Sequence, residues 1–286
     1  MPGSVRAHLR LVPGLRAVLQ DALGPLFRVE REVRPVGDCR MFVVRQPPTG
    51  PDVLVKVLPG ALSVVMDERV FEREVILLAD RLSHPSLVPP SGAGRAAALI
   101  YHTRPFVEGT TLRAWLLRKG ALPLTRAVEI LRDVLDALAH AHAAHIAHGD
   151  VKPEHVLLAA EGRTLVADTG IVGAVARSLT TGTPHAASVA LCAPAYIAPD
   201  RRQATDPASP RDDMFALGVL VQEMLTGGPP LPAAARGEDN RQLPPWLTGL
   251  LQRCLAAEPA DRWTDAAEAL AAVQPPPRRT HSRPGL

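Results

Sequence analysis

Three short segments, each centred on a charged residue, follow one another along this chain and constrain its fold more than any other feature. Lys56 interrupts an otherwise apolar run. The segment HGDVKPEH, residues 148–155, places Asp150 two residues before Lys152, and Asp168 opens an Asp-Thr-Gly triplet further along. Only three lysines occur against 29 arginines. Lysine at two of these positions therefore indicates a need for a compact ammonium, which the planar guanidinium of arginine does not replace.

The spacing of apolar residues predicts strands in the first third of the chain and helices in the remainder. Helical spacing favours helices over 14–23, 67–82, 211–226, 246–255 and 264–273. Strands are expected over 27–33 and 41–44, around Lys56, and then as two separate strands over 97–101 and 103–107. A strand-rich beginning followed by a helix-rich remainder argues for an α+β protein in two lobes.

Composition limits the partners that the chain can have. A net charge of +3 is mild, so basic residues near the ends are expected to be solvated, with no nucleic-acid partner. No segment approaches the roughly 18 apolar residues of a membrane span, and the N-terminus lacks the layout of a signal peptide. Three widely spaced cysteines do not predict a disulfide framework. These features together predict a cytoplasmic protein.

Further segments match a known family in their order along the chain. They are Phe27–Val33, Pro105–Gly109, Ala195–Asp200, Asp213–Gly218 and Arg262. With the three segments above, they resemble the bacterial serine/threonine protein kinases, over about residues 27–273. The resemblance implies a bilobal α+β protein-kinase-like fold. Its parts would be an N-terminal extension with a short amphipathic helix (1–26), a β-rich N-lobe with one main helix (27–107), a helical C-lobe (108–274) and a disordered Pro/Arg-rich tail (275–286).

The resemblance assigns the charged residues to phosphoryl transfer from ATP. Asp150 would orient the attacking hydroxyl and accept its proton, and Lys152 would neutralise the γ-phosphate. Lys56 would hold the α- and β-phosphates, oriented by Glu74 of the following helix. Asp168 would bind Mg²⁺, a hard ion that prefers carboxylate oxygen.

The same resemblance assigns four more residues to the nucleotide and its metal ions. Val107 in the hinge and Leu157 would contact the nucleotide. Arg104, just before the hinge, would fill the rear of the pocket or pair with Glu74. His155 stands where an asparagine usually binds the second metal ion. Because imidazole nitrogen is a poor ligand for Mg²⁺, Mn²⁺ is an alternative.

Glu74 lies one residue farther from His84 than the family spacing, which implies a one-residue insertion between the two. Without the insertion, Val75 would take the place of Glu74, and Lys56 would lack its partner. Asp213 would anchor the catalytic loop, and Arg262 would pair with Asp200.

Several departures from the family pattern fall on the nucleotide pocket. Arg34, Val36 and Cys39 take the places of three glycines, and their side chains prevent the close backbone approach that glycine permits. Leu54 replaces the small residue that roofs adenine. Gly149 replaces the arginine that receives an activation-loop phosphate.

Three functions remain open. The charged set that survives, with Lys56, Asp150, Lys152 and Asp168 together, favours a slow serine/threonine kinase that acts on a protein hydroxyl. The altered pocket favours a pseudokinase that serves as a signalling interaction module. The third alternative is a small-molecule kinase of the aminoglycoside-phosphotransferase type, because such enzymes share the fold and the His-Gly-Asp spelling.

Overall fold

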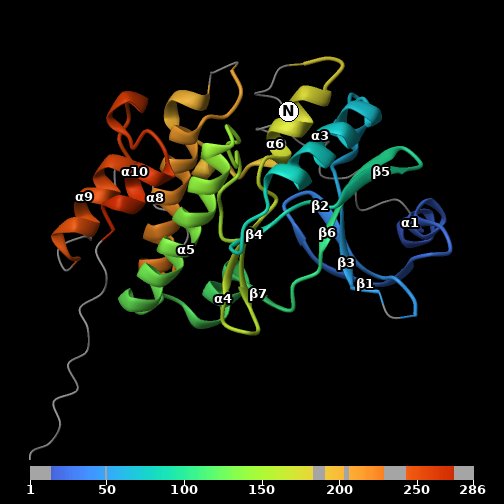
Figure 1. The fold of residues 1–286 in the computed structure, drawn as a ribbon, viewed down its shortest axis with the longest axis horizontal. Helices are drawn as coiled ribbons and strands as arrows, with labels where there is room; N and C mark the ends of the chain where they lie inside the picture. Colours follow the sequence, from blue (N-terminus) through green and yellow to red (C-terminus); the bar gives the residue numbers. More distant parts are fainter. Residues whose placement is uncertain (1–13, 49, 183–190, 203–205, 229–242, 274–286) are drawn as a thin grey trace, which may run out of the picture.

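The computed structural model describes residues 14–48, 50–182, 191–202, 206–228 and 243–273 (Figure 1). The tail that the sequence predicts to be disordered, 275–286, lies outside these residues. A strand-rich lobe and a helix-rich lobe lie side by side, with the strands of the first third at one end and the helices α5, α8, α9 and α10 at the other (Figure 1).

The first lobe is built on a five-stranded sheet in the order β1-β2-β3-β6-β5, and every neighbouring pair is antiparallel. Its strands are β1 (Arg28–Val36), β2 (Cys39–Arg45), β3 (Val53–Val57), β5 (Gly92–Ala96) and β6 (Leu99–Pro105). Side chains alternate between the two faces, so Phe42 and Val44 of β2 pack on one side while Met41 and Val43 pack on the other. The sheet is therefore covered on both faces.

At the end of this sheet, one expectation was wrong and one strand, β5, was missed. A single strand, β6, takes the place of the two strands expected over 97–101 and 103–107. A turn at Ala97 connects β6 to its antiparallel partner β5. Strand β5 begins with Gly92 and contains Gly94, and glycine is a weak strand signal. Gly94 is needed nonetheless, because a Cβ there would lie 2.8 Å from the hydroxyl oxygen of Tyr101 on β6.

Helix α1 (Leu15–Leu23) covers the outer face of this sheet. Leu15 and Leu19, one helical turn apart, are buried against apolar side chains of the strands. Gln20 ties the helix to strand β1, since its side-chain oxygen accepts from the Val29 amide at 2.9 Å and its nitrogen donates to the Phe27 carbonyl at 2.6 Å. The described part of the extension, residues 14–26, therefore packs as part of the first lobe.

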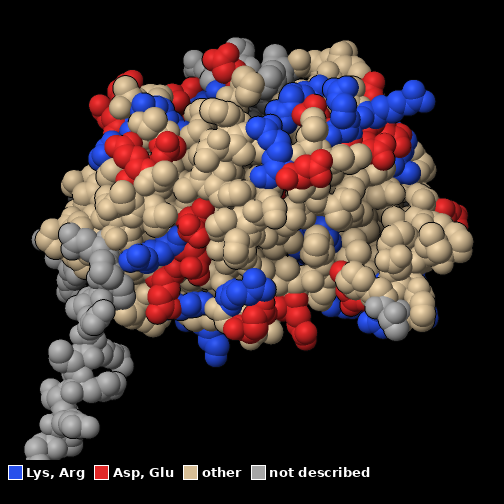
Figure 2. Space-filling model, in the orientation of Figure 1, with Lys and Arg blue, Asp and Glu red and all other residues tan. Residues whose placement is uncertain are grey.

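Helix α3 (Glu68–Arg81) covers the opposite side, after the short α2 (Gly60–Ser63). Asp67 caps it by accepting from the Val70 amide, and Phe71, Val75 and Leu78 form its buried stripe. Its exposed face carries acidic and basic residues in alternation. Figure 2 shows basic side chains with acidic ones among them over this part of the molecule.

The second lobe has a small sheet in the order β4-β9-β8-β7. Its strands are β4 (Leu87–Val88), β7 (Gly109–Thr111), β8 (Val156–Ala159) and β9 (Thr164–Ala167). Strand β4 pairs in parallel with β9. A short piece of residues 27–107, the interval expected to be the N-lobe, therefore belongs to the sheet of the other lobe.

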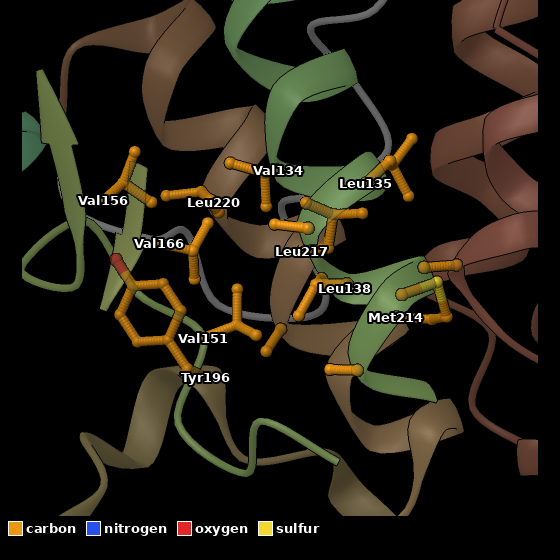
Figure 3. Packing of buried hydrophobic residues seen from close by; sticks show 14 of the residues in the cluster. Val134, Leu135, Leu138, Val151, Val156, Val166, Tyr196, Met214, Leu217 and Leu220 are labelled. Atoms are coloured by element: carbon orange, nitrogen blue, oxygen red, sulfur yellow. The ribbon is translucent and has the colours of Figure 1, made fainter. Parts of the chain in front are cut away.

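The helices of the second lobe pack around one core (Figure 3). They are α4 (Leu112–Lys119), α5 (Leu124–Ala143), α6 (Ile171–Ser178), α8 (Pro210–Thr226), α9 (Pro245–Cys254) and α10 (Ala266–Ala271), with 3-10 turns at Pro194–Tyr196, Pro199–Arg202 and Pro259–Asp261. Val134, Leu135 and Leu138 of α5 face Met214, Leu217 and Leu220 of α8 in Figure 3. This core also holds Val151, Val156 and Val166, so the loop that carries Asp150 and Lys152 is attached to a rigid base.

Replacing Leu19 by alanine tests whether α1 is part of the folded lobe. Leu19 has no exposed surface, so Leu19→Ala removes packing from a site that cannot easily collapse. We expect a loss of about 2–5 kcal/mol in the free energy of unfolding, measured by urea denaturation. Leu26→Ala, the same chemical change at a side chain that is 69% exposed, should change it by less than about 0.5 kcal/mol. Equal effects of the two variants would mean that α1 does not stabilise the lobe.

Candidate active site

The loop that carries Asp150 and Lys152 is held in place by Asp213 at the start of helix α8. The carboxylate of Asp213 accepts from the His148 amide at 2.7 Å and from the Gly149 amide at 2.8 Å. It also accepts from His142 Nε2 at 2.9 Å. Asp213 is almost fully buried, and both of its carboxylate oxygens accept hydrogen bonds. The position of the loop therefore depends on this one carboxylate.

Gly149 follows this anchor and has a backbone conformation that suits glycine. Its φ is +80°, and a Cβ would lie 3.1 Å from Cβ of Val172. The arginine usual at this position in the family would be strained here, and Val172 of helix α6 would have to shift by a few tenths of an ångström. The replacement of arginine by glycine is therefore built into the local geometry.

Four of the predicted charged residues come together in two buried ion pairs. Lys56 on β3 places its Nζ 2.6 Å from Asp168 Oδ2, and Lys152 places its Nζ 2.5 Å from Asp150 Oδ2. All four side chains are less than a tenth exposed. Lys56 and Asp168, which are 112 positions apart along the chain, thus form an ion pair between the lobes.

His155 joins the two pairs, and its hydrogen bonds fix which ring nitrogen carries the proton. Nδ1 lies 2.9 Å from the backbone carbonyl oxygen of Asp150, which can only accept, so Nδ1 is the donor. Burial keeps the pKa of His155 well below its usual value, so the ring is neutral and Nε2 is an acceptor. Nε2 lies 3.2 Å from Lys56 Nζ, which donates to it.

Burial and neighbouring charges shift the pKa values of the two carboxylates in opposite directions. Burial alone would raise the pKa of Asp168, but the cations of Lys56 and Arg104 hold it well below the usual range. For Asp150, burial prevails and raises the pKa, although Lys152 works against it. Burial opposes the charged form of Lys56, but Asp168 and its neighbours raise its pKa. Asp168 is therefore the firmly ionised carboxylate of the two.

A cavity of about 410 Å³ opens beside this cluster. Its walls include the predicted nucleotide contacts Arg104, Val107 and Leu157, together with Leu54. Arg34 and Val36, which replace family glycines, also line it. The volume lies in the range of small-molecule sites, about 300–1,000 Å³. Lys56 and Glu74 do not line the cavity, so the structure separates the nucleotide residues that the sequence groups together.

Comparison with known proteins identifies this arrangement. The sequence matches the protein kinase domain family over residues 39–274, which is most of the chain. The chain belongs to this family. The kinase domain is similar to bacterial serine/threonine kinases and shares their two-lobed α+β fold.

Two curated relatives and one crystal structure illustrate the similarity. The serine/threonine-protein kinase PknL of Mycobacterium tuberculosis (strain CDC 1551 / Oshkosh) is 35% identical over 203 residues, which cover 65% of this chain and 49% of PknL. PknB of Mycobacterium leprae (strain TN) is 32% identical over 236 residues, covering 76% of this chain and 37% of PknB. The crystal structure of the Mycobacterium tuberculosis PknI kinase domain has a TM-score of 0.67 and 26% identity, covering 87% of this chain and 95% of that one. The chain thus spans half or less of the curated relatives' length. Among the described residues, no helix is long and apolar enough to cross a membrane.

Glu74 of the kinase domain does not meet Lys56, contrary to the expectation from the sequence. Its Oε2 lies 2.5 Å from Nε of Arg177 on helix α6, a helix that the sequence analysis missed. Val75, the alternative partner position, is buried in the apolar core beside Phe71 and Leu78. In this arrangement Lys56 pairs with Asp168, and the carboxylate of Glu74 pairs with Arg177 of α6.

Further contacts hold α6 and the segment that follows it against the start of α3. The Asp67 amide donates to the Ser178 carbonyl at 2.8 Å, and Thr180 donates to the Val65 carbonyl through its amide at 2.8 Å and its hydroxyl at 2.9 Å. The signal for α6 was present in the sequence as an apolar stripe of Ile171, Val172 and Val175, directly after Gly170.

His102 and Arg104 of β6 also face the site, and the sequence analysis missed His102. Antiparallel pairing sets His102 opposite Lys56 and Arg104 opposite Leu54. Burial lowers the pKa of His102 to about 4, so this ring is neutral. In one continuous strand, His102 and Arg104 lie two residues apart and so share a face of the sheet. The strand break expected at residue 102 concealed this relation.

The protein kinase fold implies ATP and a divalent metal ion, but the residues around Asp168 do not fit such an ion as they are arranged. One oxygen of Asp168 contacts Lys56, and Nε of Arg104 lies 3.4 Å from the other. The acceptor nitrogen of His155, the predicted ligand for a second ion, is directed at Lys56. Within the described ranges, no three His, Cys, Asp or Glu side chains are placed to hold a metal ion. Cations already occupy the positions that the sequence assigned to Mg²⁺.

The pairing of Arg262 with Asp200 is also present, at 2.5 Å, as the sequence led us to expect. Arg262 is fully buried and stacks near the ring of Phe215 at 5.2 Å. This pair fixes the segment that ends at Asp200 to the helical lobe.

The anchor at Asp213 can be tested by a change that keeps its shape. Asp213→Asn replaces one acceptor oxygen by an NH₂ group that faces a buried amide N–H. We expect a loss of about 1–3 kcal/mol in the free energy of unfolding, measured by urea denaturation. Asp80→Asn, at an exposed carboxylate of α3, should have little effect. If both variants unfold at the same urea concentration, Asp213 does not anchor the loop.

The link between Glu74 and α6 predicts a local change in dynamics. Arg177→Ala removes the side chain that joins α6 to α3, so amide hydrogen exchange within residues 171–178 should become faster, by about two- to fivefold. The matched control is Arg73→Ala, because Arg73 also lies near Glu74, at 3.6 Å, but belongs to α3 itself. Unchanged exchange in Arg177→Ala would show that apolar contacts alone hold α6.

Proposed function

We propose that this kinase domain transfers the γ-phosphate of ATP to a serine or threonine hydroxyl of a protein substrate. The observation that carries the proposal is the buried pair of Asp150 and Lys152, which lies beside Lys56 and Asp168 on a loop anchored by Asp213. Phosphoryl transfer needs a group that positions the hydroxyl and cations that offset phosphate charge, and this cluster provides both.

Asp150 has the features of the group that receives the hydroxyl. Its Oδ2 is held by Lys152, while its Oδ1 is buried without a hydrogen-bond partner. A buried acceptor that lacks a donor is costly, and a substrate hydroxyl donating to Oδ1 would remove that cost. The raised pKa of Asp150, which burial causes, also makes it a better proton acceptor than an ordinary aspartate.

Lys56 and Lys152 supply the positive charge for the phosphates. Lys152 lies next to Asp150, where charge on the transferring group develops, and its Nζ also donates to the Leu191 carbonyl at 3.2 Å. Lys56 is held by Asp168 and His155, so it must exchange these partners for phosphate oxygens when a nucleotide extends from the cavity. The expected Mg²⁺ or Mn²⁺ at Asp168 and His155 has no part in these steps, because cations already face both groups.

The similarity to proteins named serine/threonine-protein kinases favours this function over a small-molecule kinase. It also favours an enzyme over a pseudokinase that acts only as an interaction module. We propose a protein as the substrate on the same ground.

The test is Asp150→Asn in an assay of radiolabelled phosphate transfer to a generic protein substrate. Loss of a positioned base lowers the rate by about 10²- to 10⁴-fold, while nucleotide affinity measured by calorimetry should stay within about threefold of wild type, because Asp150 does not line the cavity. Asp21→Asn, at an exposed carboxylate of α1, serves as the control and should leave the rate unchanged. If Asp150→Asn costs nothing, the phosphate transfer does not come from this site and the interaction-module reading takes its place.

A further inference from the structure

Arg104 connects the nucleotide cavity with the catalytic cluster. It lines the cavity, is 9% exposed, and places its Nε 3.4 Å from Asp168 Oδ1. Neither of these two atoms satisfies the geometry of a hydrogen bond, with each other or with another described group. The contact is thus an ion pair without a hydrogen bond, so Nε of Arg104 can donate to a further partner and Oδ1 of Asp168 can accept from one.

The buried cluster carries a surplus of positive charge. Its cations are Lys56, Lys152 and Arg104, and its anions are Asp150 and Asp168. Among the side chains that these contacts join, the three cations exceed the two anions by one charge. A buried charge that lacks a counter-ion is unfavourable. A divalent cation would increase the surplus, whereas a phosphate group would remove it.

Arginine is also chemically suited to phosphate. Its guanidinium stays charged in proteins even where burial lowers its pKa, and its planar fork of N–H donors binds phosphate oxygens through more than one hydrogen bond. Strand β6 holds the base of the side chain rigidly, because Arg104 is paired with Leu54 of β3. A fixed cation that reaches both the cavity and Asp168 occupies the place of an ion that would bridge carboxylate and phosphate.

We propose that Arg104 takes the place of a divalent metal ion at Asp168, so that the domain binds the phosphates of a nucleoside triphosphate without a divalent metal. The inference rests on the nucleotide cavity of the proposed function, but not on phosphate transfer. It makes Arg104 a determinant of nucleotide binding, with Asp168 as its counter-ion.

The experiment is a calorimetric titration of ATP into the whole chain, once with EDTA and once with excess Mg²⁺. For the wild type, the dissociation constants in the two buffers should agree within about threefold. Arg104→Met should weaken binding in EDTA by about tenfold or more, the scale of a lost charge-assisted hydrogen bond, and by much less in Mg²⁺. Arg31→Met, at another arginine that lines the cavity, should change both constants by the same factor.

A second variant separates the two roles of Asp168. If Asp168 serves only as the counter-ion of Arg104, Asp168→Asn leaves binding in EDTA intact or tightens it, because the positive surplus grows. If Asp168 carries a metal ion that bridges the phosphates, the same variant loses the binding that Mg²⁺ supports. Thermal unfolding of each variant establishes that it is folded before it is titrated.

Each outcome bears on one claim. Binding by the wild type only in Mg²⁺, or binding in EDTA that Arg104→Met leaves unchanged, overturns the role of Arg104 even if phosphate transfer is observed. Metal-free binding that depends on Arg104 supports that role even if no transfer occurs, which would count against the proposed function alone. Absence of binding in both buffers overturns both.

Discussion

The ion pair between Lys56 and Asp168 is the interaction on which the arrangement of the lobes' interface depends. Lys56 is fixed in the sheet of the first lobe, and Asp168 follows strand β9 of the second. Two unlike charges that are both withdrawn from water must stay together, because separating them leaves each uncompensated. The neutral His155 contacts Lys56 of this pair, and the cation of Arg104 contacts Asp168. Arg104 also lines the cavity, which therefore lies next to the pair.

Helix α6 contacts the carboxylate that the family pattern assigns to Lys56. Arg177 of α6 pairs with Glu74, while the apolar stripe of α3 is buried in the core. The same helix begins at Gly170, two residues after Asp168, so one short segment positions both candidate partners of Lys56. A change at α6 therefore acts on the site through α3 and through Asp168 at once.

The sequence was sufficient for the order of the segments, the strand that holds Lys56, the loop of Asp150 and Lys152, and the anchor at Asp213. The strand follows from local periodicity, whereas the order of the segments, the loop and the anchor follow from the resemblance of short motifs to those of the kinase family. The partners of Lys56 and Glu74 were not predictable, because they depend on contacts between segments about 100 positions apart, such as that of α3 with α6. The position of Arg104 was anticipated, but not its pairing with Asp168, because a misplaced strand break concealed which face it shares with Lys56.

Helix α1 has a practical consequence for how such domains are delimited. The family match starts at residue 39, yet Val29 of β1 and both buried leucines of α1 complete the packing around Phe42 and Val44. A recombinant fragment cut at residue 39 would lose β1 and leave β2 as an open sheet edge with an apolar face in water, a combination that promotes aggregation. For this chain the domain boundary set by folding lies ahead of the boundary set by sequence similarity, and expression should begin before residue 14.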